Sequence, residues 1–197
     1  MTPAVVVIDV QNDFCHPRGV FAGAGLVVDD LDGLVANINT LVARAREQDV
    51  PVVWVTMEWA DDAEVGLLAS RSPFLATAGL RAGTWGCEPV DGLDVRPADR
   101  FVRKTRFSSF HRTGLEATLT ELGADTLVVA GVRTDFCVES TVRDAFFRDY
   151  RAVVVRDAVA GYFPDLHENS LRVMGTVFAR IAGTASEALP LPVGGAG

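Results

Sequence analysis

Lysine is nearly absent from this chain of 197 residues. Lys104 is the only lysine among eighteen Lys and Arg residues, so every other basic side chain is an arginine. With 26 Asp and Glu residues the formal net charge is −8, and no stretch combines clustered basic residues with aromatic ones. A chain this acidic is not expected to have nucleic acid or an anionic membrane surface as its main partner.

Cysteine is also scarce, and long hydrophobic runs are missing. The three cysteines Cys15, Cys87 and Cys137 are odd in number and widely spaced, which fits neither a disulfide framework nor a zinc-ligand pattern. No run of about 18 apolar residues occurs, so no membrane span is expected. The N-terminal segment has no basic residue before its apolar run, which Asp9 interrupts, so it predicts a strand rather than a signal peptide. We therefore expect a reduced, cytoplasmic protein.

Short apolar runs are what the sequence has in quantity. Hydrophobic residues make up 49% and charged residues 22% of the chain, as in a globular domain. Four nearly continuous, β-branched runs bounded by Gly, Pro or Asp predict strands that are covered on both faces. They are residues 4–9, 51–56, 125–131 and 151–157. A weaker fifth strand is predicted over 101–104, and a sixth near Ala182.

Helical patterns lie between these runs, with apolar residues at i, i+3, i+4 and i+7. They predict helices around residues 31–45, 115–122, 137–150 and 171–181. Strands that alternate with helices are typical of βαβ units with right-handed crossovers. We predict a three-layer α/β/α sandwich around a doubly wound, mainly parallel sheet of five to six strands. It would form one domain over residues 1–185, with 186–197 as a flexible tail.

Three reactive side chains follow predicted strands. Asp9 ends the first strand, Lys104 ends the segment FVRK, and Cys137 follows DTLVVAG after the turn VRTDF. Each alone has an ordinary explanation, as a turn cap, a surface charge or an inert small hydrophobe. Because the carboxyl ends of parallel strands meet at one edge of a sheet, we expect the three to form one site there. A compact ammonium suits such a site better than the larger, planar guanidinium.

Cys137 has the position of a nucleophile. It is expected at the start of the helix over 137–150, where N–H groups and the helix dipole stabilise a thiolate or an oxyanion. A nearby ammonium would lower the thiol pKa further. The turn before it is not a phosphate loop, since it lacks multiple glycines and a Lys-Ser/Thr ending. Cys15 and Cys87 have no such helix entry, although Cys15 is a candidate to line the pocket.

The segments VVVIDVQNDF, FVRKTRFSSF, VVAGVRTDFCVESTVRDAFFRDY and VVVRDA together resemble the isochorismatase-like cysteine hydrolases. This family includes nicotinamidase, N-carbamoylsarcosine amidase, ureidoacrylate amidase and biuret hydrolase, and the resemblance covers nearly the whole chain. It implies that Asp9, Lys104 and Cys137 are a catalytic triad. It also implies a cis peptide bond between Val132 and Arg133, with the N–H groups of Arg133 and Cys137 forming an oxyanion hole.

The resemblance implies a cysteine-dependent amidohydrolase that cleaves a C–N bond of a small amide, carbamoyl or ureido substrate through a thioester. The segments GTWGCEPV, RKTRFSSF and CVESTVRDAFFRDY are most similar to the ureidoacrylate and biuret hydrolase branch. Nicotinamidases of this family bind a metal through an Asp and two His after the second strand. That stretch reads MEWADDAEVG here, without His, so we expect no metal and no cofactor. A homodimer or homotetramer is expected from the family.

Substrate specificity is expected to reside in residues 57–98, which break the alternation of strands and helices and are long enough to be functional. Candidates for substrate contact are the loop aromatics Phe14, Trp59, Trp85 and Phe110. Packing in a local core is the alternative for these four residues. The Arg133 side chain is a candidate clamp for a substrate carboxylate, or else a salt-bridge partner of Asp135.

Other functions stay open on the sequence alone. One is isochorismatase-type hydrolysis of a vinyl ether, with Asp9 as the acid and Cys137 as a bystander, because family members of that type lack the cysteine. Thiol alkylation would leave ether cleavage largely intact. Another is a non-catalytic ligand-binding module of the same fold. A redox role for Cys137 would need a partner thiol such as Cys15.

Overall fold

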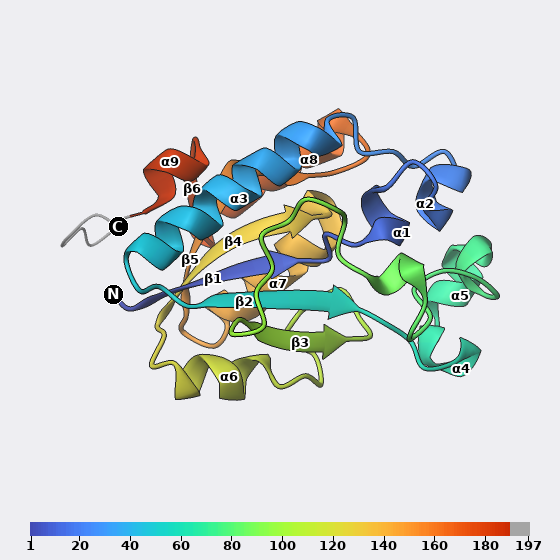
Figure 1. Ribbon diagram of the computed structural model, residues 1–197, viewed down its shortest axis with the longest axis horizontal. Helices are drawn as coiled ribbons and strands as arrows, with labels where there is room; N and C mark the ends of the chain where they lie inside the picture. Colours follow the sequence, from blue (N-terminus) through green and yellow to red (C-terminus); the bar gives the residue numbers. More distant parts are fainter. Residues whose placement is uncertain (190–197) are drawn as a thin grey trace.

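A single parallel sheet organises the computed structural model, which describes residues 1–189 (Figure 1). Its strands are β1 (Pro3–Ile8), β2 (Val52–Met57), β3 (Arg100–Lys104), β4 (Thr126–Val132), β5 (Arg151–Ala160) and β6 (Arg180–Ala182). Their order is β3-β2-β1-β4-β5-β6, and every neighbouring pair is parallel. The prediction of a doubly wound parallel sheet is confirmed.

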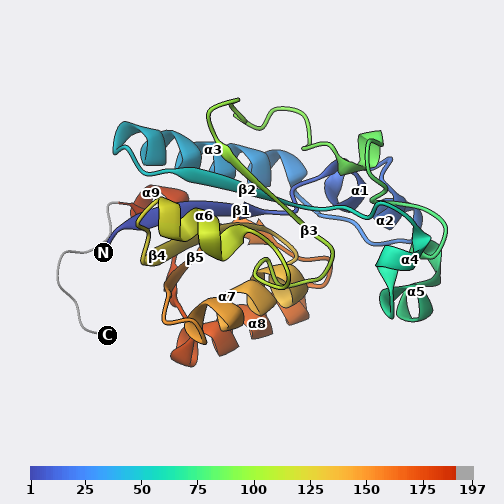
Figure 2. The same cartoon turned by 90° about the horizontal axis from the view of Figure 1, so that it is seen from below.

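Helices cover both faces of this sheet (Figure 2). On one face lie α3 (Leu31–Glu47) and α9 (Ala185–Ala188); on the other lie α7 (Glu139–Phe146) and α8 (Pro164–Val177). The helix α6 (Leu115–Glu121) connects β3 to β4. All four predicted helices are present, but α8 starts earlier than predicted and ends at Val177, so that Ile181 belongs to β6.

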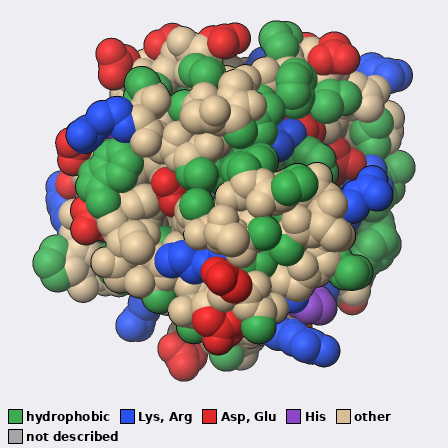
Figure 3. All heavy atoms as spheres, turned by 90° about the vertical axis from the view of Figure 1, so that its right-hand side faces the viewer, with side chains coloured by type: hydrophobic (Ala, Val, Ile, Leu, Met, Phe, Trp, Pro, Cys, Tyr) green, Lys and Arg blue, Asp and Glu red, His purple; other side chains and the backbone are tan. Residues whose placement is uncertain are grey.

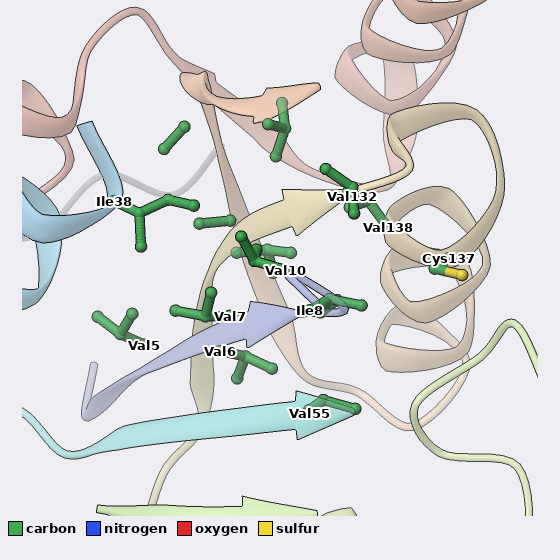
Figure 4. Close-up of a cluster of buried hydrophobic side chains, with 14 of the residues drawn as sticks. Val5, Val6, Val7, Ile8, Val10, Ile38, Val55, Val132, Cys137 and Val138 are labelled. Carbon is green, nitrogen blue, oxygen red and sulfur yellow. The ribbon is translucent and has the colours of Figure 1, made fainter. Parts of the chain in front are cut away.

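The central strands are buried because helices lie on both sides of them. All side chains from Ala4 to Ile8 in β1 and from Leu127 to Ala130 in β4 are buried (Figure 4). The α3 helix packs a stripe of apolar side chains on this core, and the Asp30 side chain caps its start by accepting from the N–H of Gly33. The continuous apolar runs of the sequence therefore follow from burial on both faces.

The strand order reverses between β1 and β4, because β1 leads to β2 and β3 on one side while β4 leads to β5 and β6 on the other. Ligands of open parallel sheets bind at the carboxyl ends of the strands at such a point. Gly131 permits close approach of the two strands there, with φ +112° and an ideal Cβ position only 2.0 Å from the carbonyl oxygen of Ile8. No larger residue fits this position without moving a backbone.

Irregular segments gather beyond the carboxyl ends of the strands, at the right of Figure 1. They contain α1 (Asn12–Cys15), α2 (Val20–Gly23), α4 (Asp62–Val65), α5 (Leu68–Arg71), η1 (Pro73–Leu75) and η2 (Trp85–Cys87). Most of them belong to residues 57–98, the stretch without regular periodicity in the sequence. The long loop thus covers the edge of the sheet where the triad was predicted.

The domain extends past its predicted end. The predicted boundary after residue 185 falls inside α9, and Ala188 and Leu189 are buried against the rest of the domain. The remainder of the predicted tail, residues 190–197, lies outside the described residues. Within residues 1–189, no helix combines the length and the apolar character needed to cross a membrane.

Candidate active site

Asp9 directly follows β1 and turns the chain at the edge of the sheet. Its backbone adopts the left-handed conformation, with φ 56°, which Asp tolerates better than most residues. Its N–H donates to the carbonyl of Val55 in β2 at 2.8 Å, and its carbonyl accepts from the N–H of Gln11 at 2.8 Å. These backbone bonds hold a fully buried carboxylate at the centre of the sheet edge.

Lys104 ends β3, two strands away from β1, and its side chain reaches across the end of β2. Its Nζ lies 2.7 Å from Oδ2 of Asp9, and neither side chain is exposed. The same Nζ donates to the carbonyls of Arg106 and Phe107, both at 3.0 Å. Despite the close ion pair, neither oxygen of Asp9 accepts a hydrogen bond of normal geometry from the described residues. A buried carboxylate with free acceptor positions is suited to take a proton from a third group.

Cys137 is the third group at this edge. It lies in η3 (Thr134–Val138), a π-helical turn that leads directly into α7 at Glu139, close to the predicted helix start at about residue 137. Figure 4 shows its side chain beyond the arrowheads of β1, β2 and β4. The charges of Asp9 and Cys137 shift the pKa of Lys104, and the charges of Asp9 and Lys104 shift the pKa of Cys137, so the three groups lie close enough to interact. The structure therefore brings the three predicted residues together.

Burial dominates the electrostatics of the three groups. It raises the pKa of the Asp9 carboxyl, which the Lys104 ammonium offsets only in part. Burial alone would lower the pKa of Lys104, but the charges of Asp9 and Cys137 outweigh it and the pKa lies above its usual value. Burial and the Asp9 charge together raise the pKa of the Cys137 thiol to about 12. Burial of the thiol thus opposes the stabilisation of a thiolate that the Lys104 ammonium favours.

The turn before Cys137 places Arg133 beside the site. The peptide bond from Val132 to Arg133 is cis. The Arg133 guanidinium pairs with Asp135 at 2.5 Å and lies 4.3 Å from the ring centre of Phe136 and 4.5 Å from that of Tyr162. The side chain thus forms the salt bridge that was the alternative to a carboxylate clamp. Its backbone N–H makes no hydrogen bond within residues 1–189.

Three of the four candidate substrate contacts are core residues. Phe14, Trp59 and Phe110 are buried in the hydrophobic core. The Phe14 ring packs 4.6 Å from that of Phe21, and Nε1 of Trp59 donates to the carbonyl of Thr105 at 3.1 Å. The Phe110 ring packs 5.8 Å from that of Tyr150, which follows α7. The three rings thus pack in a local core, the alternative that was given for them, and a contact between them and substrate stays a prediction.

Trp85 differs from the other three. Its side chain is 38% exposed, its ring meets that of His16 edge to face at 5.1 Å, and the Arg18 guanidinium lies 4.9 Å from the ring centre. A contact between Trp85 and substrate stays a prediction.

Polar residues that hold the long loop escaped the sequence analysis. The Gln11 amide donates to the carbonyls of Met57 and Cys87 and accepts from the N–H of Met57. The Asp13 carboxylate accepts from the N–H of Leu80 at 2.6 Å. Both side chains are buried. Their position in the apolar segment VVVIDVQNDF was the available signal, because buried polar side chains need partners in the fold.

Tyr162, two residues after the end of β5, is a further neighbour that the sequence did not reveal. Its hydroxyl donates to the carbonyl of Phe14 at 2.9 Å, and burial raises its pKa above the usual value. Cys15 lies near the triad, since burial and then the charge of Asp9 raise its pKa. That Cys15 lines the pocket stays a prediction.

The triad is enclosed, because Cys137 keeps only 2% of its surface exposed. Figure 3 shows the face at the carboxyl ends of the strands, where hydrophobic side chains are interspersed with charged ones of both signs. The Phe107 ring, from the segment after Lys104, packs 5.1 Å from that of Phe136, whose side chain is 38% exposed. Within residues 1–189, no three His, Cys, Asp or Glu side chains are grouped to hold a metal ion.

Comparison with known proteins identifies the family. Residues 3–186 match the family described as the isochorismatase domain. The ureidoacrylate amidohydrolase RutB of Methylobacterium radiotolerans is 35% identical over 94% of this chain and 78% of its own length. Among solved structures, a cysteine hydrolase from Pseudomonas syringae pv. phaseolicola matches with a TM-score of 0.85 and 28% identity, covering 94% of this chain and 90% of its own. N-carbamoylsarcosine amidase from Thermoplasma acidophilum matches with a TM-score of 0.76 and 29% identity, covering 95% and 98%. These findings confirm the resemblance carried by the sequence motifs, and this chain belongs to the isochorismatase family of hydrolases.

Proposed function

We propose that this protein is a cysteine-dependent amidohydrolase that cleaves a C–N bond of a small amide, carbamoyl or ureido substrate through a thioester. One observation carries the proposal: the buried ion pair of Asp9 and Lys104 lies beside the Cys137 thiol at the carboxyl edge of the sheet. Two of the similar proteins are named for the hydrolysis of such bonds, an amidohydrolase and an amidase.

The first half of the reaction forms the thioester. The Cys137 sulfur attacks the substrate carbonyl carbon while its proton passes to the carboxylate of Asp9. Burial raises the pKa of the thiol, so in this proposal attack and proton transfer to Asp9 occur together rather than from a preformed thiolate. The Lys104 ammonium stabilises the negative charge that develops on the sulfur. The N–H groups of Arg133 and Cys137 hold the oxyanion, for which the free Arg133 N–H is available.

The second half releases the products. Asp9 returns the proton to the leaving nitrogen, the C–N bond breaks, and ammonia or an amine departs. Asp9 then takes a proton from a water molecule, whose oxygen attacks the thioester carbonyl. When the second tetrahedral intermediate collapses, the carbon–sulfur bond breaks and Asp9 gives its proton back to Cys137. Each cycle consumes one water and yields an acid together with ammonia or an amine.

The enclosure of the triad fits this chemistry and imposes a condition on it. Exclusion of bulk water strengthens the electrostatic interactions of the buried groups with the developing charges. A substrate reaches Cys137 only when the side chains above it move. Phe136 is adjacent in sequence to the thiol and partly exposed, so its ring is the one we expect to move. Activity without a metal or cofactor, and assembly as a homodimer or homotetramer, stay predictions.

Ammonia release across a panel of small amides, carbamoyl compounds and ureides, including ureidoacrylate, tests the proposal. The wild-type protein should turn over at least one of them, and Cys137→Ala should lose about 10⁴-fold or more in kcat. Full turnover by Cys137→Ala on the best substrate would exclude the cysteine mechanism. Hydrolysis of a vinyl ether that survives alkylation of Cys137 would favour the alternative in which Asp9 acts as the acid.

A further inference from the structure

We infer that Thr141 and Ser109 are positioning residues, which set the distance between the Lys104 ammonium and the Cys137 thiol. This inference rests on the proposed function and adds to it two residues whose side chains, within residues 1–189, hydrogen-bond to neither the ion pair nor the sulfur. They connect the segment that binds the ammonium to the turn that carries the thiol.

The position of the Lys104 ammonium depends on the segment that follows it. An ammonium has three N–H donors. Two of them are taken by the carbonyls of Arg106 and Phe107, and Asp9 lies at 2.7 Å on the remaining side. Residues 105–107 form neither helix nor strand, so no regular backbone hydrogen bonding holds these two carbonyls in place. Side-chain contacts hold this segment instead: Trp59 donates to the Thr105 carbonyl and the Arg106 guanidinium to the Glu64 carbonyl on one side, and further contacts follow along the chain.

Thr141 supplies such a contact from one helical turn beyond Cys137. Its buried hydroxyl oxygen lies 2.7 Å from the carbonyl oxygen of Cys137, 3.0 Å from the backbone N of Ser109 and 3.0 Å from Oγ of Ser109. A hydroxyl has one proton and two lone pairs. The Cys137 carbonyl only accepts and the Ser109 N–H only donates, so the Ser109 hydroxyl is the donor of the third bond. Every bonding position of the Thr141 oxygen is therefore occupied, and all three partners belong to the two segments.

Other contacts hold the segment that follows Lys104 against α7 and the residues after it, but they do not involve Cys137. The Ser108 hydroxyl binds the Asp144 carboxylate, and the Phe110 ring packs 5.8 Å from that of Tyr150. Among the side chains of α7, that of Thr141 makes hydrogen bonds both to Ser109, in the segment that follows Lys104, and to the backbone of Cys137. Removing its hydroxyl would leave the buried Ser109 N–H without its partner and would take one hydrogen bond from the Cys137 carbonyl, so both groups would shift. A displacement of about 1 Å between reacting groups can cost about 10²-fold in rate.

Two substitutions at one position separate the hydroxyl from the shape of the side chain. Thr141→Val keeps the shape and loses the hydroxyl, whereas Thr141→Ser keeps the hydroxyl and loses the methyl. The control is Thr126→Val, which removes an equally buried hydroxyl at the amino end of β4, far from the triad. We expect Thr141→Val to lower kcat on the best amide by about 10²-fold with KM within about threefold of wild type. Thr141→Ser and Thr126→Val should keep kcat within about threefold of wild type.

An equal loss of kcat in Thr141→Val and Thr126→Val, or no recovery of kcat in Thr141→Ser, would overturn the inference, because both outcomes indicate a general structural effect. Should Thr141→Val fail to fold, Ser109→Ala takes its place. It removes the hydroxyl-to-hydroxyl bond and keeps the Ser109 N–H bond to Thr141. A fall in kcat of about fivefold or more with KM little changed is expected for it, and wild-type kcat would overturn the inference.

Alkylation of Cys137 by iodoacetamide, located by mass spectrometry from neutral to alkaline pH, gives a readout that needs no substrate. Thr141→Val should alkylate about tenfold faster than wild type because the turn that buries the thiol is released. Thr141→Ser and Thr126→Val should alkylate as wild type does. If this difference appears while the wild-type protein hydrolyses no amide, the proposed function fails and the positioning role stands. If alkylation is unchanged while amides are hydrolysed, the positioning role fails and the proposed function stands.

Discussion

The ammonium of Lys104 faces the carboxylate of Asp9 at 2.7 Å, and neither side chain has any exposed surface. Removing one member of such a pair leaves the other as an uncompensated charge in a medium of low polarity. The cost of that orphaned charge usually exceeds the net contribution of the pair itself. The free energy of unfolding should therefore fall more when one charge is removed than when both are removed.

Lys104→Met should lower the free energy of unfolding by about 3 to 5 kcal/mol and abolish turnover. The double variant Asp9→Asn with Lys104→Met should recover most of the stability and none of the activity. Lys104→Arg should not restore kcat, because the planar guanidinium does not fit between Asp9 and the two carbonyls that Lys104 binds. Urea denaturation and ammonia release measure the two properties.

Arg103→Met is the matched control for this cycle. Arg103 precedes Lys104 on the same strand, but its ion pairs with Glu58 and Glu64 are partly exposed. Its loss should cost no more than about 1 kcal/mol. Equal stability of Lys104→Met and Arg103→Met would show that the buried pair is not the sensitive element described above.

We expect the buried Cys137 thiol to make the protein less stable at alkaline pH. Burial raises its pKa from the ordinary 9.0 to about 12 in the folded protein. Above about pH 9 the unfolded chain releases the thiol proton and the folded protein keeps it, so the contribution of Cys137 is intact below that pH and falls as the pH rises. The wild-type free energy of unfolding should decrease more steeply than that of Cys137→Ala, by up to about 1.4 kcal/mol per pH unit.

Urea denaturation under reducing conditions, at pH values between the ordinary pKa values of a thiol, 9.0, and of a lysine, 10.5, isolates this effect. Cys15 and Cys87 titrate in both proteins, so the difference between the two slopes reports on Cys137. Parallel slopes would mean that the thiol is more solvated than its surroundings indicate.

The sheet and the triad could be predicted from the sequence because both follow from local patterns. A strand such as β1 is covered on both faces and therefore reads as a continuous apolar run. Asp9, Lys104 and Cys137 each follow such a run, and parallel strands bring their carboxyl ends to one edge. Neither prediction requires knowledge of which distant residues are in contact in the folded protein.

The remaining features depend on contacts between distant segments. The pKa of Cys137 is raised because the surrounding protein desolvates the thiol, and burial of that kind has no local pattern. The rings of Trp59 and Phe14 are core residues although their sequence context is that of loops. The Thr141 hydroxyl joins segments about thirty residues apart, as shown by its bond to Ser109.

Gly131→Ala should destabilise the protein by about 3 kcal/mol or more. The residue has φ +112°, and its Cβ would stand 2.0 Å from the carbonyl oxygen of Ile8, so β1 and β4 would have to separate where Asp9 and Cys137 meet. Thermal and urea denaturation measure the loss. Gly23→Ala is the control, because this glycine ends α2 with open space around it and without a positive φ. That change should be neutral or slightly stabilising, and a similar loss in both variants would refute the role of close strand approach.

Arg133→Ala should change KM for acidic and for neutral substrates alike. The guanidinium is held between Phe136 and Tyr162 and paired with Asp135, so its charge is neutralised before any substrate binds. KM for acidic and neutral amides should therefore change by the same factor, to within about threefold.

Asp135→Asn keeps the shape of the partner and frees the charge of Arg133, so it should lower KM for acidic amides selectively. Steady-state kinetics on a matched pair of amides, one with and one without a carboxylate, measure both variants. A selective rise of about tenfold or more in KM for the acidic amide in Arg133→Ala would restore the carboxylate clamp, because only a guanidinium that already binds substrate would be missed in that way.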